Sequence, residues 1–241
     1  HSLRRRQRQM CIRDRVNTVK GSNPYMFPAV DWYHELFKES TMNQRANMSV
    51  SGGGTVARYY IAASFNNDTG VLRVNGKNNF NNNIDLKKYS VRSNVNINLT
   101  KTTEAIIRFQ GNFDSYSGPL DGGDGLFAKV MKASPVLFPK YFPGSNEYAS
   151  HIYFGNYTGG NYINPYADMV KGYKNYDRTL VLAQAELKQN LDFITKGLSV
   201  RGLMSTTRYV YSDISRSYGP YYYMADSLSL IHISEPTRQE A

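Results

Sequence analysis

The chain has 241 residues, of which 41% are hydrophobic, and this size and composition fit one large all-β domain. Its formal net charge of +10 would usually indicate nucleic acid or an anionic membrane surface as a partner, but six arginines and one aspartate lie within the first fifteen residues. Half of the charge excess therefore belongs to one terminus. No run approaches 18 apolar residues, which excludes a membrane-spanning helix in this sequence.

The two ends of the chain differ from the rest. Residues 1–15 read HSLRRRQRQMCIRDR and residues 228–238 read LSLIHISEPTR, and one DNA element of sequencing-adapter type, read from its two strands, encodes both MCIRDR and LSLIHI. We therefore expect residues 1–15 and 226–241 to be artefactual extensions, in preference to a basic arm for nucleic acid or a localisation signal. The single cysteine, Cys11, lies in the first extension, so the remaining segment has neither a disulfide nor a thiolate metal site.

Apolar and polar residues alternate along six stretches of the chain. The clearest stretch is YSVRSNVNINL, where the two kinds of residue fall on opposite faces with the period of two that is typical of a β-strand. The six predicted strands are residues 46–50, 59–65, 89–99, 105–113, 181–187 and 198–211. The connections alternate in length: 52–55, 100–103 and 191–197 are short, whereas 67–88 and 117–175 are long. Outer-membrane barrels have short periplasmic turns and long extracellular loops, so we expect the long connections to lie outside the cell.

The chemistry of the polar face separates a membrane barrel from a soluble sandwich, because strands alternate in both. Strands that cross a membrane need about 9–11 residues and have a polar lumen face. The residues expected to face the lumen are Arg92, Asn94, Asn96, Arg108, Gln110, Gln184 and Glu186. The aromatic residues expected to form an interfacial girdle near strand ends are Tyr89, Phe113, Tyr116, Tyr176, Tyr209 and Tyr211. The predicted fold is all-β, an antiparallel meander of long strands that forms an incomplete part of a large transmembrane β-barrel.

The connection at 117–175 is too long for an ordinary turn and carries an unusual number of aromatic residues. Asp124 and Gly125 precede a predicted short helix at 126–133, which Pro135 ends. The residues in this loop that we expect to contact a substrate are Tyr141, Phe142, Tyr148, Tyr153, Tyr157, Tyr162, Asn164 and Tyr166. Aromatic rings beside amides suit a sugar, which has an apolar C–H face and hydroxyl groups, but the same composition is common in loops that only pack.

No set of residues predicts catalysis, a metal site or a cofactor. His34 and Glu35 lack further ligands at suitable spacing, and His151 has no nucleophile partner. Asp121 and Asp124 lack the acidic series of a calcium loop and are better explained by a polar turn. The SGGG motif at 51–54 lacks the lysine of a phosphate-binding loop and predicts a turn in which glycine adopts a positive φ. In NGKNNFNNNIDL the amides either bind sugar hydroxyls or are hydrated, and hydration is the interpretation we favour.

Three segments carry a resemblance to a known family. They are DWYHELFKES, then RANMSVSGGGTVARYYIAASFNNDTGVLR, then DLKKYSVRSNVNINLTKTTEAIIRFQGNFDSYSGPL. In order and spacing they resemble the SusC/RagA family of TonB-linked outer-membrane transporters of Bacteroidetes. The resemblance extends over residues 16–225.

This resemblance implies a fragment of a nutrient importer of the outer membrane that takes up glycans or peptides and is not an enzyme. Such a protein has an N-terminal plug inside a barrel of about 22 strands, a surface lid lipoprotein of SusD type and the TonB complex as partners, and lipid around it. By the same resemblance, residues 16–42 look like the end of the plug and residues 43–225 like the N-terminal part of the barrel. The TonB box and most of the plug are expected to lie outside this sequence.

Two further classes of function stay open. A soluble β-rich carbohydrate-binding module would use the aromatic loop and fold without detergent. A nucleic-acid binder would depend on the arginines of residues 1–15, so no nucleic-acid partner is expected if that segment is artefactual.

Overall fold

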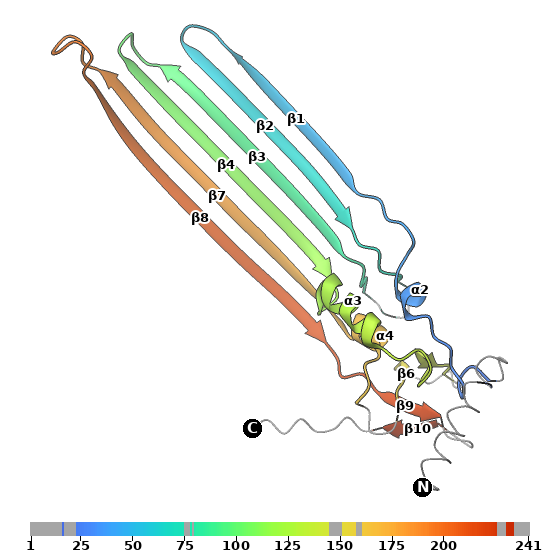
Figure 1. Ribbon diagram of the computed structural model, residues 1–241. Coiled ribbons are helices and arrows are strands. Elements are labelled where there is room, and N and C mark those ends of the chain that lie inside the picture. The colour runs from blue at the N-terminus through green and yellow to red at the C-terminus, as the bar shows by residue number, and fades with distance from the viewer. Residues whose placement is uncertain are drawn as a thin grey trace, which may run out of the picture.

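The computed structural model describes residues 16, 23–74, 78, 80–144, 151–157, 161–225 and 230–233. A single sheet of six long strands makes up most of this part of the chain, and three short helices and four short strands gather at one end of it (Figure 1). The expected extensions at 1–15 and 226–241 lie outside the described residues except for 230–233, whose backbone pairs with residues 222–225.

All six predicted strands are present, and each is longer than its alternating core. They are β1 (Gln44–Gly53), β2 (Ala57–Thr69), β3 (Asp85–Asn98), β4 (Thr103–Gly118), β7 (Gly172–Asn190) and β8 (Ser199–Ser217). They pair antiparallel in the order β1-β2-β3-β4-β7-β8, so the order of the long strands in the sheet is their order along the chain. The all-β meander predicted from the period of two is therefore confirmed.

The register places apolar residues on one face of the sheet and polar residues on the other. Directly paired residues of antiparallel strands point to the same face, and successive residues point to opposite faces. One row across β2 to β8 consists of Tyr59, Val95, Ile107, Ala185 and Met204. The next row consists of Tyr60, Asn94, Arg108, Gln184 and Ser205. Arg208 is an exception, since it pairs with Val181 and shares the apolar face.

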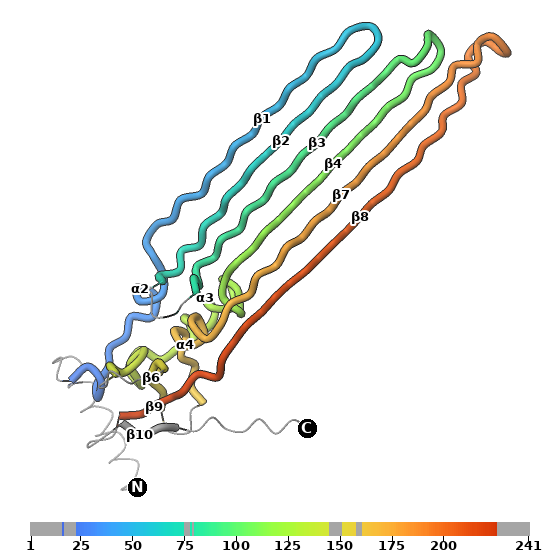
Figure 2. Tube along the Cα trace, turned by 180° about the vertical axis from the view of Figure 1, so that it is seen from behind, coloured from blue at the N-terminus to red at the C-terminus, as the bar shows by residue number. Residues whose placement is uncertain are grey.

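The connections divide by length between the two ends of the sheet, as predicted. Residues 54–56, 99–102 and 191–198 turn at one end, while the long connections 70–84 and 119–171 lie at the other (Figures 1 and 2). In the SGGG motif Gly53 has a φ of 155°, and a Cβ there would lie 2.5 Å from the carbonyl oxygen of Ala57. The prediction that glycine supplies a positive φ in this turn is confirmed.

The segments at the long-connection end fold together into a unit that we call the cap: the described residues of 23–43, 70–84, 119–171, 218–225 and 230–233. Its helices are α2 (Trp32–Leu36), α3 (Gly122–Lys132) and α4 (Pro165–Val170). Its small sheet has the order β10-β9-β6-β5, formed by β5 (Tyr141–Phe142), β6 (Tyr153–Gly155), β9 (Tyr222–Ala225) and β10 (Leu230–Ile233). Among the described residues, a buried hydrophobic cluster that includes Trp32, Leu36, Leu126, Phe154 and Tyr166 lies in this cap.

Residues 16–42 were assigned to the end of a plug, and their described part from residue 23 onward is integral to the cap. The indole nitrogen of Trp32 donates to the carbonyl of Ser134 at 2.8 Å, and the backbone nitrogen of Val30 donates to Pro135 at the same distance. From there the chain enters β1 at the long-connection end of the sheet (Figure 2). The assignment to a plug stays a prediction.

The helices follow local sequence signals. The α3 helix begins four residues before the predicted start because the glycines after Asp121 join its first turn. The α2 helix is capped by Asp31, whose side chain accepts from the backbone nitrogen of His34 at 3.1 Å. Within the described ranges, every helix is too short or too polar to cross a lipid bilayer.

Candidate functional site

The seven residues predicted to face a lumen share one face of the large sheet. Arg92 pairs with Gln110, and Asn94 pairs with Arg108 and through it with Gln184. Asn96 and Glu186 belong to the next row of the same face. The alternation therefore grouped them correctly, and whether this face lines a lumen stays a prediction.

Glu186 is the centre of a charged cluster on this polar face. Its side chain is 6% exposed and accepts from Nη1 of Arg108 at 2.8 Å and from Nε of Arg201 at 2.7 Å. The carboxylate thus joins three neighbouring strands, β4, β7 and β8, through charge-assisted hydrogen bonds. Arg201 was not singled out from the sequence, although its place in the alternation of β8 puts it on this face.

The polar face is hollowed at two places. A concavity of about 320 Å³ lies over β1 to β4, where small residues such as Ser49, Ala62 and Ser90 leave space beside Tyr60 and Asn112. A larger one, about 640 Å³, lies at the short-turn end between the 54–56 and 99–102 turns and is lined by Thr55, Thr102, Glu104 and Lys188. Both are lined mainly by hydroxyl, amide and charged groups.

The predicted substrate contacts of the long loop divide into buried and accessible residues. Phe142, Asn164 and Tyr166 are 4%, 1% and 2% exposed, so their side chains belong to the interior of the cap. Tyr141 and Tyr153 are half-buried at the small sheet. Tyr157 and Tyr162 are exposed, with ring centroids 6.0 Å apart, and Tyr148 lies outside the described residues. In this loop most of the aromatic composition serves packing.

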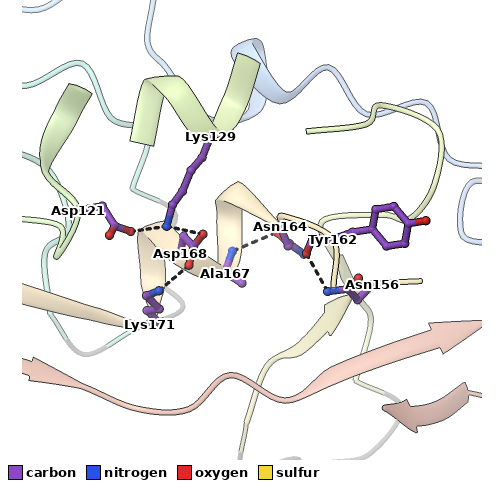
Figure 3. A network of polar contacts seen from close by, with 8 residues as sticks. All are labelled: Asp121, Lys129, Asn156, Tyr162, Asn164, Ala167, Asp168 and Lys171. Carbon is purple, nitrogen blue, oxygen red and sulfur yellow. Dashed lines mark hydrogen bonds and ion pairs between the residues drawn. The ribbon is translucent and has the colours of Figure 1, made fainter. Parts of the chain in front are cut away.

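Asn164 caps the start of α4 (Figure 3). Its side-chain oxygen accepts from the backbone nitrogen of Ala167 at 3.1 Å, and its amide donates to the carbonyls of Lys140 and Gly155 at 3.0 and 2.8 Å. One buried side chain therefore caps a helix and holds two connections beside it. Asn156 acts similarly, since its amide donates to the carbonyl of Tyr162 at 3.1 Å.

Lys129 joins α3 to the start of α4 (Figure 3). Its ammonium lies 2.7 Å from a carboxylate oxygen of Asp121 and 2.8 Å from one of Asp168, and Asp168 also pairs with Lys171 at 2.5 Å. Burial lowers the pKa of Lys129, but the hydrogen bonds and negative charges of the two aspartates outweigh it and raise the pKa above its usual 10.5. Asp121, considered above as a calcium ligand, is thus engaged by a lysine.

The asparagine-rich connection after β2 has a role that the sequence interpretation missed. Asn82 is 2% exposed and donates to the carbonyls of Met169 and Gly172 at 2.5 and 3.3 Å, while Asn78 donates to Val170 at 2.6 Å. These are carbonyl groups at and just after the C-terminal end of α4, which lack partners within the helix. The expectation of hydration is wrong for Asn82, because its amide bonds to backbone in the interior.

The expected girdle of aromatic residues is also wrong for four of its six members. Tyr89 and Phe113 are direct partners on the apolar face. Tyr116 and Tyr176 pair with each other on the opposite face, and Tyr209 and Tyr211 share that face in β8. For Tyr116 and Tyr176 the physical reason is strand length, because β4 and β7 extend beyond the predicted strands and residues an odd number of positions apart in one strand point in opposite directions. Tyr209 and Tyr211 lie within the predicted strand, and their face follows from their pairing with Leu180 and Arg178.

His34 and His151 each have a polar side-chain partner. Nδ1 of His34 lies 2.7 Å from a carboxylate oxygen of Asp31, and the hydrogen bonds from His34, above all that of its backbone nitrogen, hold the pKa of Asp31 below its usual value. Nε2 of His151 lies 2.8 Å from the hydroxyl of Tyr223. Within the described part of the chain, no group of three or more His, Cys, Asp or Glu residues is arranged to hold a metal ion. The absence of enzymatic activity stays a prediction.

A comparison of the sequence with known proteins finds a curated protein that is similar to part of the chain. The fold is an all-β meander of strands with one apolar and one polar face. No family model matches the chain. A curated protein, TonB-dependent receptor P26 of Formosa agariphila, is 23% identical over 149 residues, which is 61% of this chain and 13% of that protein. This similarity supports the TonB-dependent receptor family for the chain, which spans a small part of the relative's length.

Proposed function

We propose that the chain is part of the barrel wall of a TonB-dependent outer-membrane importer of SusC/RagA type. The observation that carries this proposal is the two-faced sheet. Its strands have 10 to 19 residues, enough to cross a bilayer, and its apolar face leaves Met48, Ile107, Leu187 and Met204 at least half exposed to solvent. A soluble monomer rarely exposes so extended an apolar surface, whereas a barrel strand directs it into lipid.

The same geometry gives the wall a direction. With the short turns in the periplasm, the cap lies at the cell surface and the polar face, including Glu186 and Arg108, borders the hydrated interior. Residues 23–43 then belong to the surface cap, because the chain enters β1 from that end. This placement competes with the assignment of residues 16–42 to the end of a plug.

The transported substrate and the partners follow from the proposed family type. A SusC-type importer takes up glycans or peptides with energy delivered through TonB and carries a lid lipoprotein of SusD type on its outer surface. The chain itself performs no bond chemistry in this proposal. Its strands keep lipid away from the substrate path, and the cap forms part of the surface near the mouth.

The proposal is tested by placing a charge on each face of β4 in the full-length protein. Ile107→Lys puts an ammonium on the apolar face, where we expect a cost of about 2–4 kcal/mol if the side chain lies near the bilayer midplane. Asn112→Lys places the same charge on the polar face of the same strand and is expected to cost less than about 1 kcal/mol.

The measurement is the amount of heat-modifiable protein in isolated outer membranes. Ile107→Lys should reduce that amount severalfold, and Asn112→Lys should leave it unchanged. Recovery of the unmodified protein from the soluble periplasm, or equal tolerance of both lysines, would refute the barrel-wall function. A soluble protein that binds glycan without detergent would instead establish a carbohydrate-binding module.

A further inference from the structure

Four tyrosines form a row on the polar face, close to the cap. Tyr116 and Tyr176 are direct partners whose rings stack with centroids 4.7 Å apart and planes at 13°. The Tyr176 ring lies 5.7 Å from that of Tyr211, and Tyr209 follows on the same face of β8. We call Tyr116, Tyr176, Tyr209 and Tyr211 the tyrosine ladder. It extends across β4, β7 and β8.

The open aromatic surface of the ladder lies on β8. Tyr116 and Tyr176 cover one another, whereas Tyr211 and Tyr209 are 45% and 60% exposed. A girdle at the membrane surface does not explain these rings, because a girdle must lie on the apolar face. β8 is the edge strand of the described sheet and all of its residues are exposed, so the placement of the two rings on the polar face, and not their exposure alone, is what bears on a ligand.

The carboxylates beside the ladder are already paired with cations. Asp114 accepts from Nε of Arg178 at 2.9 Å, and Asp213 lies 3.4 Å from the ammonium of Lys174. Both pairs stand on the same face as the tyrosines. Neither Asp114 nor Asp213 is therefore left free to bind a cationic ligand. The tyrosine ladder itself presents uncharged rings and hydroxyl groups.

A polar concavity adjoins the ladder on the same face. Asn112, which lines the 320 Å³ concavity over β1 to β4, pairs with Leu180, and Leu180 pairs with Tyr209. One paired row thus connects the concavity to the open rings. The hydroxyls of Ser49 and Ser90 and the amide of Asn112 provide donors and acceptors there. The volume is at the lower end of the range of ligand pockets.

We propose that the tyrosine ladder and the adjoining concavity bind a neutral oligosaccharide. A pyranose ring has an apolar C–H face that packs on an aromatic ring and hydroxyls that bond to amide and serine groups. The two open rings, Tyr209 and Tyr211, lie two residues apart on one face of β8, and this spacing along the strand fits adjacent sugar units better than a single one. This inference rests on the proposed function, because the polar face is a substrate path only if the sheet is a barrel wall.

The test uses the full-length protein in detergent and titration calorimetry with maltohexaose, cellohexaose and xylohexaose as probes. We expect at least one of them to bind, and the double variant Tyr209→Ala/Tyr211→Ala to weaken that binding by about tenfold. The double variant Tyr209→Phe/Tyr211→Phe keeps the rings and should bind within about threefold of the unmodified protein. Tyr89→Ala removes a similarly exposed ring from the other face of the sheet and should leave affinity unchanged.

The outcomes separate this inference from the proposed function. The heat-modifiable form of the protein in outer membranes is measured first, and its absence in the unmodified protein counts against the barrel-wall function itself. If the heat-modifiable form is present, three results overturn the oligosaccharide site. They are failure of all three probes to bind, equal binding by the alanine variant, and preference for an anionic oligogalacturonate. Loss of the heat-modifiable form in the alanine variant also overturns it, since the rings would then pack against the protein's own chain.

Discussion

At the scale of single residues, the cap depends on polar side chains that each satisfy several partners. Lys129 is the clearest case, because its ammonium lies between the carboxylates of Asp121 and Asp168, which come from two segments far apart in the sequence. The side chains of Lys129 and Asp121 are 28% and 32% exposed and that of Asp168 is 14% exposed, so water screens the pair with Asp121 in part and the pair with Asp168 less.

Replacing Lys129 with methionine should loosen the contact between α3 and α4. We expect a loss of about 1–2 kcal/mol, because a similar side-chain length is kept while two charge-assisted hydrogen bonds are lost. The measurement is the rate of limited proteolysis within residues 119–171 of the full-length protein. Lys132→Met, on an exposed position of the same helix, is the control and should change little. Equal effects of both substitutions would contradict the role of Lys129.

The raised pKa of Lys129 makes this contribution depend on pH. A lysine whose pKa is higher in the folded state stabilises that state fully below its unfolded pKa, about 10.5, and loses the contribution as pH rises through the folded value. The difference in protease resistance between the unmodified protein and Lys129→Met should therefore be constant from neutral pH to about pH 10 and shrink above it. A difference that persists unchanged above the folded pKa would show that the ion pairs are not its cause.

At the scale of elements, the helix α4 is held by asparagines at both ends. Asn164 caps its first turn, and Asn82 and Asn78 bond to carbonyls at and just beyond its last turn. The helix has six residues and would be unstable alone in water. Its stability therefore comes from the connections that pack around it.

Removing the amide of Asn82 should separate the 70–84 connection from α4. Asn82→Ala leaves the carbonyls of Met169 and Gly172 without this partner in a buried environment, at a cost of about 1–3 kcal/mol. Asn175→Ala, on an exposed position of β7, is the matched control. Hydrogen exchange of residues 165–170 should accelerate in the first variant and not in the second. Unchanged exchange in Asn82→Ala would mean that the amide does not hold the helix.

At the scale of the whole molecule, the large sheet has two open edges. In the described part of the chain β1 pairs on one side with β2 and β8 on one side with β7, so each presents unpaired backbone groups. All residues of β8 are exposed. Open edges next to an exposed apolar face favour association with other chains.

The isolated chain of 241 residues should therefore aggregate in aqueous buffer and remain dispersed only in detergent. Sedimentation velocity with and without detergent above its critical micelle concentration measures this directly. A monodisperse monomer without detergent would contradict the prediction and favour the soluble carbohydrate-binding module.

Much of the large sheet could be predicted from the sequence, because a period of two is a local property of each strand. The grouping of Arg92, Asn94 and Arg108 on one face needed only the alternation and the antiparallel order. The opposite orientation of Phe113 and Tyr116 was also present in the sequence, three positions apart. It was missed because the predicted strand ended at residue 113, whereas β4 continues to Gly118.

The sequence by itself determined the faces, the order of the long strands and the ends at which short and long connections lie. Only the tertiary structure decided which aromatic residues of the cap are buried. Trp32, for example, finds its carbonyl partner 102 residues away, and no local pattern encodes that contact. The same holds for the ladder: alternation places each tyrosine on the polar face, but the stacking of Tyr116 on Tyr176 depends on the register of two strands joined by a connection of more than fifty residues. The local period of two sets the face of the sheet on which a side chain lies, and long-range packing sets which side chains it contacts.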